Sequence, residues 1–431
     1  MDVARHLQEN RCGKRGYGRW AVTIRFLTSV IRDLYAAFRC SLRIRSAQKK
    51  APRQDNFQIG FDGYPFLEPL TGVGWYAFHL LEDFANREGV LVNLYTHTLI
   101  PEDKAPGFIV KFEHLKNLHF RYYPIPSNIF LSSKFWFLFG ACFLTPLFIA
   151  LDQNDIFFSP NFVTPRLFRV TGRKVITVHD CTFAFFPELV RKETLNHLRR
   201  YLPNEIKTAG KIIAVSNQTK RDIEKIFTVA PEKVKVVYNG NSLKESAPRA
   251  ISNKPYLLFV GTLEPRKNIL SILDAFERVR NKGIFFHLYL IGKVGWSSSK
   301  ILEKIASHPF SADISRLSYV DSESIVSFYR EAFCLLFPSL YEGFGLPVVE
   351  AMSMGCPVIA TALASIPEVG GDACLYVKQD PESIAEGIVK LYEDEELRRA
   401  LGAKGLQQAR KFSWKTCADE TLEVLKEAAR S

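Results

Sequence analysis

The sequence lacks the closely spaced cysteines that a structural zinc site or a redox-active pair requires. Its eight cysteines are scattered from Cys12 to Cys417, and no two stand in CxxC spacing. Several lie in apolar runs, where cysteine serves as a small buried side chain. This usage favours a reducing compartment. Because the N-terminus also lacks the apolar region and cleavage site of a secretory signal, we predict a cytoplasmic protein.

The chain contains no uncharged apolar run of the length that a membrane-spanning helix needs. The stretch FWFLFGACFLTPLFIA, at 135–150, has sixteen residues without a charge and is interrupted by Pro146. A spanning helix takes about 20 apolar residues. The stretch therefore predicts a buried helix, and a hydrophobic membrane-docking surface is the alternative.

The body of the protein lacks an excess of positive charge. The formal net charge is +12, but residues 1–53 hold thirteen Lys or Arg and three acids, a net of +10, which leaves +2 for the rest. A nucleic-acid groove in the body is therefore not expected.

The basic arm has helical periodicity. Arg25, Arg32 and Arg39 flank an apolar stripe whose members recur every three or four residues across 19–45: Trp20, Ile24, Leu27, Ile31, Leu34, Phe38 and Leu42. This pattern predicts a basic amphipathic helix on an anionic membrane surface. A helix packed on the protein's own body and an organellar transit peptide are alternatives. The polar stretch that follows, up to residue 56, predicts a linker.

From residue 57 short apolar strands alternate with helices, which is typical of α/β proteins with parallel sheets. The predicted strands are FQIGFDG, VLVNLYT, HFRYYPI, DIFFSP, KVITVHD, KIIAVS and KVKVVYNG, then YLLFVGT, FFHLYLIG, RLSYV, CLLFPS, PVIAT and CLYV. An Asn-, Ser- and Pro-rich stretch separates the two sets. We predict an arm and linker at 1–56, domains at 57–240 and 256–412, an interdomain linker at 241–255, and a final helix at 413–431.

One stretch, SLYEGFGLPVVEAMSMG at 339–355, places a glycine-containing turn between a predicted strand and a predicted helix. Loops at that position in open α/β sheets are where ligands bind. Pro347 suits the start of a helix, because its missing N–H would have no helical partner there. Glycine lets the backbone approach a ligand closely. We expect three backbone amides to face a phosphate or a sugar: those of Phe344, Gly345 and Leu346.

Two carboxylates, Glu342 and Glu350, bracket this turn with seven residues between them. Glu350, in the first turn of the predicted helix, could accept hydrogen bonds from the vicinal hydroxyls of a ribose, and Glu342 from a sugar hydroxyl. The pair would then hold opposite ends of a nucleotide sugar. The structural alternative is that Glu350 complements the helix dipole and Glu342 is solvated.

A second loop, in FVGTLEPRKN, carries Arg266 and Lys267 just before a helix expected to open near Asn268. Cations beside a helix N-terminus suit an anion, because the unpaired amides and the helix dipole add to their charge. A solvated loop capped by Asn268 is the alternative.

These motifs occur together, in order, with the run SIPEVGGDA. From about residue 57 to 425 the chain resembles the retaining glycosyltransferases of family four. That family has the GT-B fold, in which two Rossmann-like domains face each other across a cleft. The resemblance implies donor contacts at these positions: sugar at Glu342, ribose at Glu350, diphosphate at Arg266 and Lys267, and base near Tyr319 and Val320.

The N-terminal half would supply the other wall of the cleft. The resemblance places Gly72 and Gly74 beside the donor phosphate and the acceptor. It also implies that His179, at the end of the strand ITVHD, contacts the donor sugar, with Asp180 orienting its ring. A hydrogen-bonded structural histidine is the alternative. The glycines also fit a nicotinamide-cofactor pattern, which we discount because the second strand does not end in an acid.

Two positions depart from the family. Thr262 and Trp75 stand where relatives often have arginine. The phosphate charge would therefore rest more heavily on Arg266 and Lys267, and a basic contact from the first helix is in doubt.

The sequence lacks a DxD triad in a loop after a strand, and the acidic run YEDEEL, at 392–397, predicts a solvated helix start. We therefore expect neither a metal nor another cofactor. Arg266, Lys267 and backbone amides would stabilise the departing diphosphate. The resemblance implies retention of configuration, with same-face attack in which the leaving phosphate accepts the acceptor's proton.

Together these features predict a hexosyltransferase that uses a nucleotide sugar. GDP-mannose is our first expectation, because VGTLEPRKN and SLYEGFGLP look most like bacterial mannosyltransferases of surface-polysaccharide assembly. The acceptor would be a saccharide or a lipid-linked saccharide at the inner face of the cytoplasmic membrane, in polysaccharide or glycolipid synthesis such as that of lipopolysaccharide. A sugar-nucleotide epimerase on the same fold and a non-enzymatic membrane-peripheral scaffold are alternatives.

Overall fold

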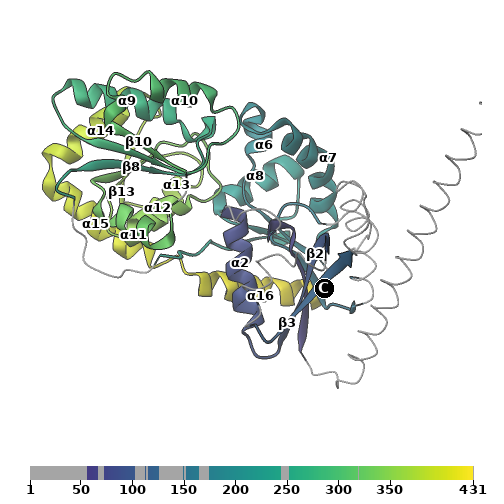
Figure 1. Ribbon diagram of the computed structural model, residues 1–431. Helices are drawn as coiled ribbons and strands as arrows, with labels where there is room; N and C mark the ends of the chain where they lie inside the picture. The colour runs from purple at the N-terminus through teal and green to yellow at the C-terminus, as the bar shows by residue number, and fades with distance from the viewer. Residues whose placement is uncertain are drawn as a thin grey trace, which may run out of the picture.

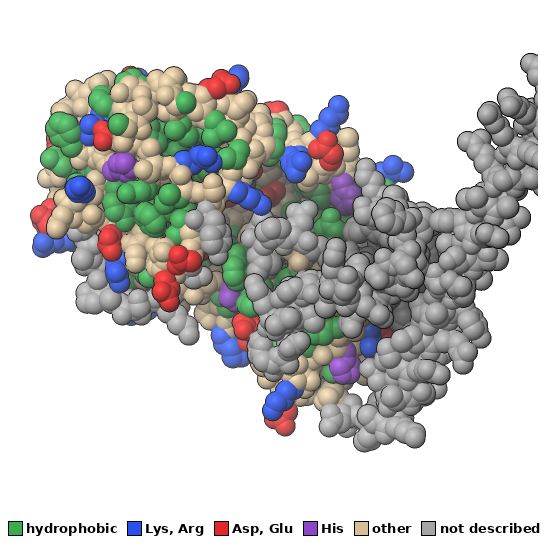
Figure 2. All heavy atoms as spheres, in the orientation of Figure 1, with side chains coloured by type: hydrophobic (Ala, Val, Ile, Leu, Met, Phe, Trp, Pro, Cys, Tyr) green, Lys and Arg blue, Asp and Glu red, His purple; other side chains and the backbone are tan. Residues whose placement is uncertain are grey.

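The structure is a computed structural model, and it describes residues 56–66, 72–101, 112, 115–125, 149, 152–164, 174–243, 252–318 and 320–430. The basic arm, the apolar stretch 135–150 except residue 149, and Tyr319 lie outside these residues. None of the described helices is long and apolar enough to cross a membrane. The described surface in Figure 2 carries basic and acidic side chains interspersed, as expected for a body of nearly neutral charge.

The first lobe, called the N-terminal lobe, is built on a parallel seven-stranded sheet with the order β3-β2-β1-β4-β5-β6-β7. Its strands are β1 Phe57–Asp62, β2 Val90–Pro101, β3 Leu118–Ile125, β4 Ile156–Ser159, β5 Lys174–Val178, β6 Lys211–Ala214 and β7 Val234–Val236. Its helices are α2 Gly72–Ala85, α6 Thr182–Phe185, α7 Lys192–Thr208 and α8 Asn217–Phe227. The strands are apolar and largely buried because helices cover both faces of a parallel sheet.

The second, C-terminal lobe holds a parallel six-stranded sheet with the order β10-β9-β8-β11-β12-β13. Its strands are β8 Tyr256–Val260, β9 His287–Ile291, β10 Ile314–Leu317, β11 Cys334–Phe337, β12 Val358–Thr361 and β13 Cys374–Val377. Its helices are α9 Ile269–Asn281, α10 Ser299–Ala306, α11 Ser322–Glu331, α12 Leu346–Ser353, α13 Ile366–Gly370, α14 Pro381–Glu393 and α15 Glu395–Ala409. Each predicted strand is present, although β10 ends three residues before the predicted run RLSYV does.

Both sheets reverse their strand order at one point, between β1 and β4 in the N-terminal lobe and between β8 and β11 in the C-terminal lobe. In open α/β sheets the crevice outside the carboxyl ends of the strands at this switch point is where ligands bind. The loops after β8 and β11 carry the residues predicted to hold the donor. The topology brings these two loops together, although Lys267 and Glu342 are 75 residues apart in sequence.

The last helix, α16 (Trp414–Arg430), returns to the N-terminal lobe and lies beside α2 (Figure 1). Its buried side chains, among them Cys417 and Leu425, belong to the same core cluster as Leu80 and Phe84 of α2. The chain therefore crosses between the lobes twice. The two crossings touch where Asn241 forms a parallel bridge with Ser413. The sequence predicted this helix but not where it packs.

Candidate active site

A buried group of charges lies at the switch point of the C-terminal lobe. Glu342, in the loop after β11, is 7% exposed, and its carboxylate accepts from Arg266 Nη1 (2.8 Å) and from Lys267 Nζ. Arg266 Nη2 also donates to Glu264 (2.8 Å). Burial raises the pKa of Glu342, but the two cations outweigh it and lower this pKa to about 2. Glu342 is therefore an ionised anchor for both cations.

Arg266 and Lys267 differ in how far their donors are engaged. Arg266 is held on both sides, since its guanidinium also donates to the carbonyl oxygen of Tyr341 (2.9 Å). Lys267 Nζ bonds Glu342 and lies 5.1 Å from the centroid of the Phe337 ring. A lysine ammonium has three donors, so Lys267 retains the greater capacity to meet an anion.

The N-terminus of α12 has no side-chain cap. Gly345 occupies the N-cap position with φ of 108°, a conformation that side-chain-bearing residues rarely adopt. A Cβ there would lie 2.7 Å from Ile366 Cδ1. Within the described chain the amides of Phe344, Gly345 and Leu346 donate to no backbone or side-chain acceptor. The predicted amides thus sit at a helix start suited to an anion.

Glu350 lies on the same helix, one residue beyond the first turn in which it was predicted. It is the fifth residue of α12, and no acid occupies the first turn, because the helix begins at Leu346. Its carboxylate accepts from the Tyr329 hydroxyl of α11 (2.7 Å). Burial raises the pKa of Glu350, and this hydrogen bond opposes the rise. Tyr329 fixes the carboxylate, and no pattern in the sequence predicted this partner.

Val320 is partly buried and packs against the core of the C-terminal lobe. It follows β10 and precedes α11, whose N-cap Asp321 accepts from the amides of Glu323 and Ser324. The structure does not describe Tyr319, so the proposed base contact of this pair stays a prediction.

His179 directly follows β5 in the N-terminal lobe, and neighbouring groups hold its ring in place. Its Nε2 lies 2.8 Å from the Pro160 carbonyl oxygen, and its ring meets the Tyr76 ring edge-on at 5.0 Å. Burial lowers the pKa of His179, so the ring is neutral at pH 7. Asp180 does not bond the ring in the described contacts; its carboxylate accepts from the Thr182 amide instead (2.9 Å), which corrects the predicted orienting role.

The structure brings His179 against the loop that leads into α12. A Cβ on Gly343 would overlap the carbonyl oxygen of His179, so the two lobes meet here backbone to backbone. Beside this contact Tyr341 reaches into the N-terminal lobe, where its hydroxyl donates to Asp222 (2.6 Å) and accepts from the Cys181 amide (3.2 Å). The sequence analysis did not identify Tyr341 and Asp222, because a tyrosine next to a loop is typical of a hydrophobic core residue.

Gly72 and Gly74 begin α2 as predicted. Gly72 is exposed, and a Cβ there would meet nothing within 4 Å, whereas Gly74 is buried. Trp75, in the position where relatives often have arginine, is 43% exposed. The start of α2 thus offers open space and an aromatic face rather than a charge.

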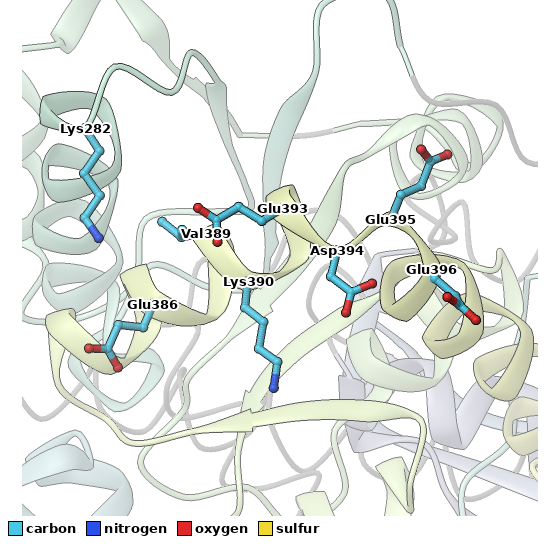
Figure 3. A pocket seen from close by; sticks show the side chains of 8 residues that line it. All are labelled: Lys282, Glu386, Val389, Lys390, Glu393, Asp394, Glu395 and Glu396. Atoms are coloured by element: carbon cyan, nitrogen blue, oxygen red, sulfur yellow. The ribbon is translucent and has the colours of Figure 1, made fainter.

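No group of three or more His, Cys, Asp or Glu that could hold a metal occurs among the described residues. The acidic run at 392–397 contributes instead to a surface hollow, of about 640 Å³, between α9 and the α14–α15 junction. Figure 3 shows its side chains spread along α14 and the start of α15 and pointing in different directions, with Lys282 facing them from the end of α9. This hollow includes none of the predicted donor residues.

Comparison with known proteins follows the same division of the chain. Residues 70–245 match the family model described as Glycosyltransferase Family 4, and residues 242–408 match the model described as Glycosyl transferases group 1. The chain belongs to the group 1 glycosyltransferases. It is therefore a glycosyltransferase of a retaining hexosyltransferase family, which favours a transferase over the epimerase and scaffold alternatives.

One curated relative of this glycosyltransferase is O-antigen chain mannosyltransferase B from Escherichia coli. The two are 28% identical over 386 residues, which covers 86% of this chain and 99% of the relative.

Two solved structures share the fold. The sucrose-phosphate synthase of Thermosynechococcus elongatus has a TM-score of 0.67 at 20% identity, covering 86% of this chain and 98% of that one. Anabaena Alr3699/HepE in complex with UDP-glucose has a TM-score of 0.64 at 18% identity, covering 86% of this chain and 99% of that one. At these identities the likeness concerns the two Rossmann-like sheets.

Proposed function

We propose that this glycosyltransferase moves a hexose, with mannose as the first expectation, from a nucleotide sugar to a saccharide or lipid-linked saccharide in surface-polysaccharide or glycolipid synthesis. The observation that carries the proposal is the uncapped N-terminus of α12, which lies between Glu342, the partner of the buried Lys267, and Glu350. The name of the Escherichia coli relative supports mannose and a polysaccharide product.

In this reading the donor spans the switch point of the C-terminal lobe, facing His179 across an interdomain cleft. The diphosphate meets Lys267 and the amides of Phe344, Gly345 and Leu346, which stabilise the negative charge that develops as the glycosidic bond breaks. Glu342 holds Lys267 and Arg266 in place and lies within the reach of a sugar hydroxyl. Glu350 accepts from the ribose hydroxyls. His179, neutral and partly buried, presents its exposed surface to the sugar.

Calorimetric titration with GDP, UDP and ADP tests the donor site, on the wild-type protein and on Glu350→Ala. We expect one nucleotide to bind and the variant to lose most of that affinity, because the ribose hydroxyls lose their acceptor. The experiment decides the base, since GDP-mannose is our first expectation and the Anabaena structure holds UDP-glucose. Binding of none of the three would contradict the donor site as described.

Transfer itself is tested with GDP-mannose and UDP-glucose as donors and a lipid-linked saccharide as acceptor. We expect product formation that needs the acceptor, without added metal. Conversion of the nucleotide sugar in the absence of acceptor would point to an epimerase instead.

We also propose that the enzyme works at the inner face of the cytoplasmic membrane, held there by its basic arm. The arm carries ten of the twelve net positive charges, and each basic residue near an anionic surface contributes about 1 kcal/mol. Deletion of residues 1–53 should release the protein from anionic vesicles in a sedimentation assay. Unchanged sedimentation would contradict this placement.

A further inference from the structure

A short segment of the C-terminal lobe contacts both the N-terminal lobe and the loop that leads from β11 into α12, residues 338–345, called the α12 loop. It comprises Ser365 and the five-residue helix α13. Ala364, just before it, has φ of 50°, an uncommon conformation for a residue with a side chain. Such conformations persist where the surrounding structure fixes them and are found at functional sites. The contacts of this segment show what it holds.

The Ser365 side chain is fully buried and faces the α12 loop. Its hydroxyl lies 2.9 Å from the carbonyl oxygen of Glu342 and 3.0 Å from that of Phe344. In a trans peptide the C=O and the following N–H point in opposite directions, and the described chain contains no cis peptide. Two carbonyls turned toward Ser365 therefore turn the amides of Gly343 and Gly345 away from it.

The other end of the segment is bound to the N-terminal lobe. The Glu368 carboxylate accepts from the Asn217 amide (2.8 Å) and the Gln218 amide (3.3 Å) at the start of α8, and from the Tyr238 hydroxyl (2.6 Å). A carboxylate at a helix N-terminus is favoured by the helix dipole. From the same helix Thr219 Oγ1 lies 3.4 Å from the Gly343 carbonyl oxygen. Docking of α8 thus acts on the loop directly and through α13.

We infer that Ser365 is a positioning residue for the donor diphosphate and that Glu368 links its placement to the docking of the N-terminal lobe. The inference rests on the proposed function, since it takes the α12 loop as the diphosphate site. With α8 docked on Glu368, α13 is held in place. Ser365 then fixes two peptides of the loop, one of which carries the Gly345 amide proposed to meet the phosphates. With the lobes apart Glu368 loses these donors, and the loop can rotate its peptides.

Titration with a matched pair of nucleotides tests the role of Ser365. The probes are whichever of GDP, UDP and ADP the wild-type protein binds most tightly, and the corresponding monophosphate. Ser365→Ala should weaken the diphosphate about tenfold, as expected for losing oriented bonds to a charged group. It should weaken the monophosphate less than about twofold, because base and ribose contacts remain. A general loss of folding would weaken both alike.

A double-mutant cycle tests the link to the other lobe. Glu368→Gln removes the charge and one acceptor from the α8 contact and should weaken the diphosphate about threefold, although Glu368 is not part of the proposed donor site. Because both residues act through one segment, the double variant should bind about as Ser365→Ala does. Losses that multiply, to about thirtyfold, would show independent action. Glu382→Gln is the control, an exposed carboxylate in the first turn of α14.

Three results would overturn the inference: equal losses for the two nucleotides in Ser365→Ala, wild-type binding in Glu368→Gln, or losses that multiply in the double variant. If Ser365→Ala does not fold, the diphosphate affinity of Glu368→Gln against its control decides. Failure of the proposed function looks different, because the wild-type protein would then bind none of the nucleotides, and the inference would fall with it.

Discussion

Helices α8 and α12 both follow a strand of a parallel sheet and both begin at the contact between the lobes, yet their N-termini are opposites. At α8 the Ser216 hydroxyl accepts from the backbone amide of Thr219. The Glu368 carboxylate accepts from the backbone amides of Asn217 and Gln218. At α12 the N-cap is Gly345, with no side chain to accept anything.

The difference shows how one fold separates docking from binding. The orphan amides of a helix start need acceptors. The α8 amides find theirs in the protein, and the N-terminal lobe is thereby docked. The α12 amides find no such acceptor within the described chain, and the loop before them carries Glu342, the partner of Lys267.

The largest effect is expected where the uncapped loop meets the other lobe. A Cβ in Gly343→Ala would overlap the His179 carbonyl oxygen, so the loop and the lobe contact must move apart. A displacement of about 1 Å at a reacting centre costs about 100-fold in rate, and we expect at least that loss in kcat/KM. Circular dichroism should show an intact fold. Activity within tenfold of the wild type would contradict the close contact.

The charges beside α12 come next. Glu342→Gln leaves Lys267 buried without its carboxylate, and removing one partner of a buried pair destabilises by about 3–5 kcal/mol. Glu264→Gln is the matched control with a smaller cost, because Arg266 keeps Glu342. Urea denaturation measures both. Equal costs for the two variants would show that Glu342 is not the anchor.

The same pair predicts an acid dependence. The folded pKa of Glu342 is lowered from its ordinary 4.5 to about 2. Its contribution is therefore complete above pH 4.5 and is lost as the pH falls toward 2. The stability gap between the wild type and Glu342→Gln should narrow over that window, and a constant gap would contradict the shift.

A smaller effect concerns the carboxylate further along α12. Tyr329→Phe removes the bond to Glu350, and we expect nucleoside diphosphate affinity to fall about threefold to tenfold. Because burial raises the pKa of Glu350 and this bond opposes the rise, affinity should fall as the pH drops, with a midpoint above the ordinary glutamate value. The variant should move that midpoint higher. Calorimetry at several pH values measures both the affinity and the midpoint of its pH dependence. An unchanged midpoint in the variant would show that Tyr329 does not belong to the site.

The smallest effect is expected at the capped helix. Ser216→Ala leaves the Thr219 amide without its acceptor and should cost about 1 kcal/mol of folding stability. Urea denaturation measures this loss. A variant as stable as the wild type would mean that Glu368 alone satisfies the start of α8.

The sequence predicted the regular parts of the fold well. Apolar runs such as KVITVHD are strands, and the helices begin near the turn residues from which they were predicted. Both features could be predicted because hydrophobic periodicity and local backbone conformation are determined within a few residues. It did not predict that α16 joins the N-terminal lobe, since packing between segments more than 300 residues apart leaves no local pattern.

The candidate site was predicted in part. Glu342, Arg266 and Lys267 were expected to share one site, and the structure brings them into contact. Their pairing with one another was not foreseen, because spacing tells which residues meet but not which oxygen bonds which nitrogen. Ser365 and Glu368 lie in the run SIPEVGGDA, which carried the resemblance to the family but gave no indication of what either side chain touches.

The path of α16 has a consequence for how the protein folds while it is being synthesised. Domains usually fold one after another as the chain leaves the ribosome, the first one first. Here the apolar face of α2, with Leu80 and Phe84, is completed by residues 417–428, which are translated more than 300 residues later. The first lobe to be made thus keeps an open core until the whole second lobe and α16 have been synthesised.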